Sequence, residues 1–155
     1  MKAKRTRWLA ACALIAYGGI LIRLIVFKAI PTIHIGRLRL RFAGTRTGPA
    51  NLIPFKTILA QLTGGGHRLI AVVNLLGNIL PFMPVGFLLP LVLPSISWQK
   101  GLVLAVFTGL TVEVLEVIFQ VGIFDVDDLV LNALGVMLGY RTFVLLRASA
   151  VSSFF

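Results

Sequence analysis

The chain has 155 residues, of which 58% are hydrophobic and 13% are charged, about half the charged share of an average soluble domain. It has too little polar surface for a water-soluble fold, and its apolar content excludes intrinsic disorder. In such a chain the net charge of +10 points to the anionic headgroups of a lipid bilayer and away from nucleic acid. We expect residues 1–155 to form a single integral membrane domain.

The start of the chain resembles a targeting signal but is too short to be one. Cations precede an apolar run, and Leu9-Ala10-Ala11-Cys12 is similar to a lipoprotein processing site. Only residues 8–11 separate the cations from the cysteine, whereas a signal needs an apolar stretch of about 7–15 residues. The apolar run continues to about Ile30, so we expect a retained membrane helix. As the single cysteine, Cys12 also excludes an internal disulfide.

Four segments have the length of about 20 residues that a helix needs to cross a bilayer. Pro81, Pro84 and Pro90 interrupt the second of them. The sequence therefore predicts an all-α bundle of four transmembrane helices, over about residues 8–30, 69–93, 101–121 and 128–146.

The first loop, residues 31–68, contains two patterned stretches. Arginines alternate with apolar residues from Arg37 to Phe42, and this period of two predicts an extended, half-buried segment. After Pro54, apolar residues recur at helical spacing from Phe55 to Leu62. That spacing predicts a short interfacial or re-entrant helix.

The connections between the spans gather the polar side chains at one end. Spans one and two are joined on the same membrane face as spans three and four, so the opposite face holds both termini. At about 1.5 Å per residue, the polar residues within the spans lie within roughly 15 Å of the first face. They are Arg23, Asn74, Asn78, Glu113, Glu116 and Asn132, and Asp125, Asp127 and Asp128 lie at the face itself.

The orientation follows from the basic residues before the first span. Four cations at positions 2–7 favour a cytoplasmic N-terminus in the plasma membrane. The polar end of the spans then lies in the outer leaflet.

Glu113 and Glu116 are the candidate catalytic residues, since they lie one helical turn apart. A carboxylate at this depth is costly unless it is paired, solvated or protonated. The pair is either a general acid/base site or a structural partner of Arg23 and the nearby asparagines. Asn74 and Asn78 share a helical stripe, where they either satisfy backbone groups freed by Pro81 or recognise a polar ligand.

The acidic segment before the fourth span has two interpretations. Asp128 begins or caps the helix and shares a face with Asn132. Alternatively, the oxygens of this segment bind a hard cation and a phosphate-bearing lipid. The spacing matches no metal motif, and His34 and His67 have no sequence partner, so we predict no metal and no cofactor.

Several blocks of this sequence resemble the VanZ-like family in order and spacing. They span about residues 46–140, and together they are specific. The blocks are Asn51-Leu52-Ile53-Pro54-Phe55, Asn74-x-x-Gly77-Asn78, Phe82-x-Pro84-x-Gly86, Glu113, Phe124-Asp125-x-Asp127-Asp128, Asn132-x-x-Gly135 and Gly139-Tyr140.

The resemblance implies a small bacterial cell-envelope membrane protein. The namesake of the family accompanies glycopeptide resistance and lowers susceptibility to teicoplanin, a lipid-tailed glycopeptide. Two positions depart from the family pattern: Glu116 stands where Gln is common, and Gly122 and Ile123 stand where an Arg often precedes the Phe-Asp pair. The additional acid makes the buried site more charged.

Our leading hypothesis is a polar pocket in one leaflet that binds an amphiphile, such as a lipid-linked wall precursor or a lipoglycopeptide. The alternatives are an intramembrane acid/base enzyme acting on a lipid-linked envelope substrate, a small proton-coupled transporter and a non-catalytic assembly partner. The oligomeric state stays open. The candidate ligand-binding residues are Asn51, Asn74, Asn78, Glu113, Asp125, Asp128, Asn132, Arg23 and Arg46.

Overall fold

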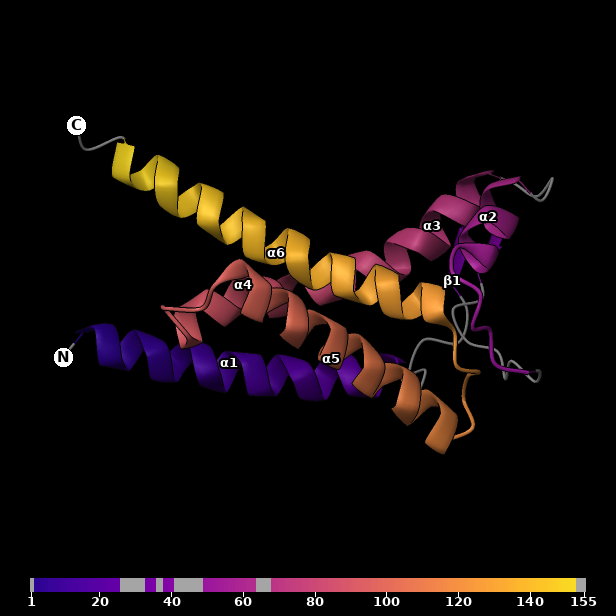
Figure 1. Cartoon of the computed structure of the whole chain (residues 1–155), viewed down its shortest axis with the longest axis horizontal. Coiled ribbons are helices and arrows are strands. Elements are labelled where there is room, and N and C mark those ends of the chain that lie inside the picture. Colours follow the sequence, from indigo (N-terminus) through magenta and orange to yellow (C-terminus); the bar gives the residue numbers. More distant parts are fainter. Residues whose placement is uncertain (1, 26–32, 36–37, 41–48, 64–67, 153–155) are drawn as a thin grey trace.

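The chain folds into a helical bundle (Figure 1). The computed structural model describes residues 2–25, 33–35, 38–40, 49–63 and 68–152. The predicted all-α membrane bundle is confirmed, including a short helix in the first loop. The helices are α1 (Lys2–Ile25), α2 (Lys56–Thr63), α3 (Arg68–Ile79), the 3-10 turn η1 (Leu80–Phe82), α4 (Met83–Val92), α5 (Trp98–Ile118) and α6 (Val126–Ser152).

Four stretches of these helices are long and apolar enough to cross a membrane. They are Lys4–Leu24, Ala71–Val92, Trp98–Ile118 and Val126–Ser149, the shortest of them 21 residues long, which spans about 30 Å at 1.5 Å per residue. Large apolar side chains such as Ile15, Phe107 and Leu145 are more than 60% exposed on the bundle. Such an outer surface is stable against acyl chains and not against water, so this is a multi-pass membrane protein.

The second span is broken at Pro81 alone of its three prolines, since Pro84 lies in the first turn of α4 and Pro90 lies inside that helix. Because Pro81 has no N–H to donate and its ring hinders the preceding turn, α3 ends at Ile79 and a 3-10 turn precedes α4. The hydroxyl of Tyr17 in α1 donates a hydrogen bond of 2.7 Å to the carbonyl of Pro81. The first span is thereby attached to the break in the second.

Glycines allow α6 to approach the second span closely. A Cβ atom on Gly135 would overlap the carbonyl oxygen of Ile79, and one on Gly139 would overlap that of Met83. On the facing helix, a Cβ on Gly86 would overlap the carbonyl oxygen of Val136. Membrane helices associate through such close van der Waals packing, because lipid gives them no hydrophobic driving force.

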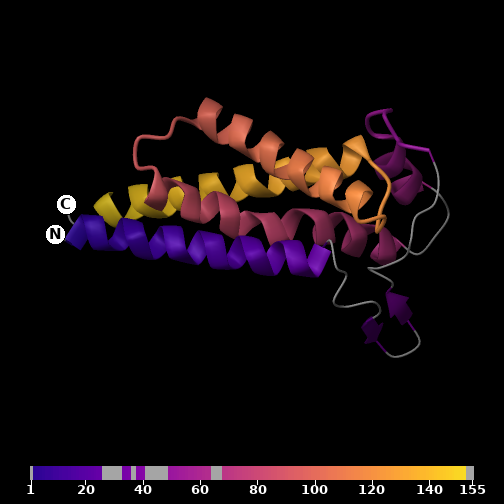
Figure 2. The same cartoon turned by 90° about the horizontal axis from the view of Figure 1, so that it is seen from below.

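The two ends of the bundle differ in the segments they carry. Both termini and the α4–α5 turn lie at one end, which we call the terminal end; α2, the start of α3 and the α5–α6 turn lie at the other, which we call the polar end (Figures 1 and 2). This is the arrangement that the connectivity predicts. All five acidic residues of the chain fall between positions 113 and 128, toward the polar end.

The first loop contains a short antiparallel pair, β1 (Ile33–Ile35) and β2 (Leu38–Leu40), in which Ile33 pairs with Leu40. The predicted extended conformation is confirmed for β2. Arg37, Arg41 and Arg46 lie outside the described residues.

We expect Gly86→Ala to destabilise the bundle by about 1–3 kcal/mol, because the methyl group overlaps the backbone of α6. The measurement is thermal unfolding of the purified protein in detergent. Gly18→Ala in α1 is the matched control, because a Cβ there meets no atom within 4 Å, and its stability should equal that of the parent or slightly exceed it. Equal stability of both variants would contradict the close packing of α6 against α4.

Candidate functional site

The polar end is organised around the first residues of α6. The side chain of Asp125 accepts a hydrogen bond of 2.9 Å from the N–H of Asp127. The backbone carbonyl of Asp125 accepts one of 3.2 Å from the N–H of Leu129. Asp125 is therefore the N-cap of α6. Asp128, which the sequence placed at the start or cap of this helix, lies in its first turn.

Asn51 joins the first loop to this cap. Its N–H donates to the carbonyl of Phe124 at 2.8 Å, and its carbonyl accepts from the N–H of Val126 at 3.0 Å. Its side-chain amide donates to Asp125 at 3.0 Å and to Thr57 at 2.9 Å. The hydroxyl of Thr57 in turn donates to the second oxygen of Asp125 at 2.7 Å. Asn51 and Asp125, which are 74 positions apart in the sequence, thus belong to one connected unit.

Asp127 holds the N-terminus of α2. Its carboxylate accepts hydrogen bonds from the backbone N–H groups of Phe55, Thr57 and Ile58, the last two at 2.7 and 3.1 Å. A negative charge at this position complements the helix dipole and satisfies N–H groups that have no partner within the helix. Phe55 has φ of 65°, which is strained for a bulky residue. The bond to Asp127 helps to hold that conformation.

Glu113 of α5 is buried beneath the cap, with 2% of its surface exposed. One carboxylate oxygen accepts a hydrogen bond of 2.9 Å from the N–H of Asp125. Negative charges on Asp128, Glu116 and Asp125 act against a charge on Glu113. The carboxylates of α5 and α6 therefore form one electrostatic group.

Asn78 of the second span and Asn132 of the fourth span lie with the acids of this end. We call Glu113, Asp125, Asp128, Asn78 and Asn132 the cluster. The side-chain amide of Asn78 donates to the carboxylate of Asp128 at 2.5 Å, which connects α3 to α6. Asn132 is 3% exposed and lies against Gly109 of α5, one turn from Glu113. A carboxylate and two amides inside apolar spans are costly unless hydrogen-bonded.

The structure brings together part of the predicted set of site residues. Asn51, Asp125 and Glu113 are linked by hydrogen bonds, as are Asn78 and Asp128, and Asn132 is buried on the adjacent turn. Glu116 is half-buried beside Gly122. Asn74 is half-buried one turn before Asn78.

The predicted set also contains two arginines, of which the structure describes Arg23 alone. Arg23 is exposed on α1, and no ion pair joins it to Glu113 or to any other described residue. Arg46 lies outside the described part of the chain.

Thr57 and Asp127 belong to the site and were not among the predicted ligand-binding residues. Asp127 accepts hydrogen bonds from backbone N–H groups, and no pattern of side chains in the sequence predicts such a contact. Thr57 follows Pro54 by three positions at the start of the predicted short helix, a place where a hydroxyl commonly takes part in capping.

The cluster offers carboxylate and amide oxygens together with amide donors. These groups suit hydrogen bonding to hydroxyl, amide or ammonium groups of a ligand. In the described ranges, no three Asp, Glu, His or Cys side chains converge as a metal site would require.

The chain matches the VanZ/LLP1 family over residues 14–147. It belongs to this family and is a membrane protein. The match extends from within α1 to within α6 and so includes parts of the first and fourth spans and all of the second and third, which is wider than the residues 46–140 expected from the sequence blocks. No curated protein and no solved structure matches the chain.

We expect Asp127→Ala to release the N-terminus of α2 while leaving the four spans folded. Loss of a charged acceptor for part-buried N–H groups costs about 1–3 kcal/mol, so the amides of Thr57 and Ile58 should exchange at least about tenfold faster. The measurement is hydrogen exchange followed by mass spectrometry. Thr63→Ala at the other end of α2, where the exposed hydroxyl bonds only its own helix, is the control. Unchanged exchange in Asp127→Ala would show that the carboxylate does not hold α2.

Proposed function

We propose that this protein is a bacterial cell-envelope protein whose polar end binds the headgroup of an amphiphile from the outer leaflet. The observation that carries the proposal is the buried cluster of acids and amides, contributed by α3, α5 and α6, at one end of an otherwise apolar bundle. An amphiphile can place its polar headgroup there while its tail remains in the surrounding lipid. The ligand would be a lipid-linked wall precursor or a lipoglycopeptide.

The residues divide into two roles in this proposal. Glu113, Asn78, Asp128 and Asn132 bind the headgroup, with Asn74 on the same stripe of α3. Asn51 and Asp125 hold the first loop over them through the hydrogen bonds described above. In this proposal Arg23 or Arg46 supplies positive charge to an anionic headgroup.

The association with glycopeptide resistance rests on the resemblance to the namesake of the family. Teicoplanin carries a fatty acyl tail on a polar headgroup. Its headgroup can therefore bind at the polar end while its tail remains in the lipid. We propose that expression of the protein lowers susceptibility to teicoplanin by engaging the antibiotic or its lipid-linked target at the polar end.

At matched expression, we expect Glu113→Gln and Asp128→Asn each to lower teicoplanin resistance at least about fourfold, because each replaces a carboxyl group of the cluster with an amide. The measurement is the minimal inhibitory concentration in a susceptible bacterial host. Lys100→Gln at the terminal end is the control and should retain resistance. If both acid variants retain full resistance, these residues take no part in the mechanism. Mass spectrometry of envelope lipids from the same cells separates binding from catalysis, because only an acid/base enzyme would leave a converted lipid that disappears in Glu113→Gln.

The proposal also requires the N-terminus to be cytoplasmic. In a Cys12→Ala background, we expect Ala60→Cys in α2 to react with a membrane-impermeant maleimide in intact cells, and Gln99→Cys in the first turn of α5 to react only after permeabilisation. Both positions are exposed on the bundle. The reverse pattern would place the polar end in the cytoplasmic leaflet and exclude an extracellular ligand.

A further inference from the structure

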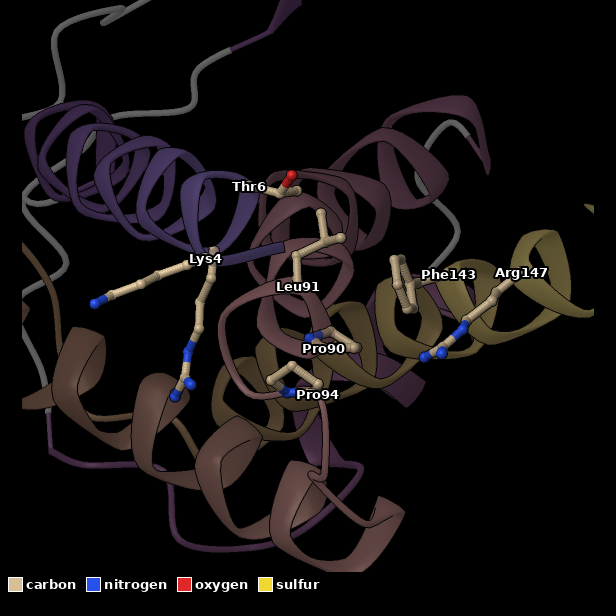
Figure 3. A pocket seen from close by; sticks show the side chains of 8 residues that line it. Lys4, Thr6, Pro90, Leu91, Pro94, Phe143 and Arg147 are labelled. Atoms are coloured by element: carbon tan, nitrogen blue, oxygen red, sulfur yellow. The ribbon is translucent and has the colours of Figure 1, made fainter. Parts of the chain in front are cut away.

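The terminal end of the bundle contains a cavity of about 610 Å³ between α1, the end of α4 and α6 (Figure 3). Its floor is apolar, formed by Pro90, Leu91, Pro94 and Phe143. Because proline has no backbone N–H, the two prolines add apolar surface and no donor to this floor. The volume lies in the range of sites that bind small molecules.

Cations surround this floor. Lys4 and Arg7 line the cavity from α1, and Arg147 lines it from α6. Lys4 and Arg147 lie on opposite sides of Leu91 and Pro90, and the guanidinium group of Arg147 points back toward the prolines (Figure 3).

The sequence supplies no acid to neutralise these cations locally. All five acidic residues lie between positions 113 and 128, at the polar end, and the described residues of the terminal end include further cations at Arg5 and Lys100. An anionic group on another molecule therefore complements the charge of this cavity.

The depth of the cavity in the membrane identifies the chemistry of that molecule. The apolar window of α1 begins at Lys4, and that of α6 ends at Ser149, so the cations lie where acyl chains give way to headgroups. A ligand that fits has an anionic headgroup directly attached to an apolar chain.

We propose that this cavity is a binding site for an anionic phospholipid of the leaflet at the terminal end. Its phosphate lies among Lys4, Arg7 and Arg147, and one acyl chain covers Leu91 and Phe143. The site is separate from the acid cluster and does not depend on the function proposed for that cluster.

The test is retention of lipid by the purified full-length protein, measured by native mass spectrometry in detergent. The probes are dioleoylphosphatidylglycerol and dioleoylphosphatidylcholine, which share acyl chains and differ in net charge. Glycerol 3-phosphate serves as an anionic headgroup without chains. The cavity variant is Lys4→Gln/Arg7→Gln/Arg147→Gln. The control variant, Arg5→Gln/Lys100→Gln/Arg141→Gln, removes the same charge from exposed residues outside the cavity.

We expect the parent and the control to retain phosphatidylglycerol in preference to phosphatidylcholine. In the cavity variant this preference should fall at least about tenfold, since each cation near a headgroup adds to the attraction. Equal losses in both variants would indicate diffuse attraction and overturn the site. Competition by millimolar glycerol 3-phosphate would identify a soluble phosphate as the ligand and overturn the lipid. Absence of any preference in the parent would also overturn it. A helical circular dichroism spectrum matched among the three proteins establishes that each result reports on binding.

Discussion

A carboxylate inside an apolar bundle must be satisfied by hydrogen-bond donors, and this requirement shapes the polar end. Asp125 and Asp127 are each 1% exposed, and their partners come from a loop and a short helix more than 65 residues earlier. The donors of Asp127 are backbone N–H groups at the start of α2, and those of Asp125 include Asn51 and Thr57. Satisfying the two acids therefore fixes Asn51 and the start of α2 against the start of α6.

The features set by length and polarity were predictable from the sequence. Helices such as Trp98–Ile118 follow from uninterrupted apolar runs, and the break at Pro81 follows from its missing N–H. Connectivity alone predicted that Glu113, Asn78 and Asn132 approach the same end, because short turns require neighbouring spans to be antiparallel.

The hydrogen-bond partners within the site were less predictable. No spacing rule connects Asn51 to Asp125, and only the family resemblance named both. Asp127 binds backbone groups that every residue possesses, so its role in holding α2 has no signature in the sequence. Arg23 was expected near the acids because of its depth in the first span. Depth does not fix the direction in which a helix faces, and the structure has Arg23 exposed.

The close contact of α6 with α3 and α4 has a consequence for ligand entry. Gly135, Gly139 and Gly86 bring backbone against backbone, so no side chain lies between these helices at those contacts. In the proposed function, a headgroup that reaches Glu113 therefore passes beside α2, whose N-terminus is attached to Asp127 by hydrogen bonds. The contacts of α6 with α3 and α4 then stay intact.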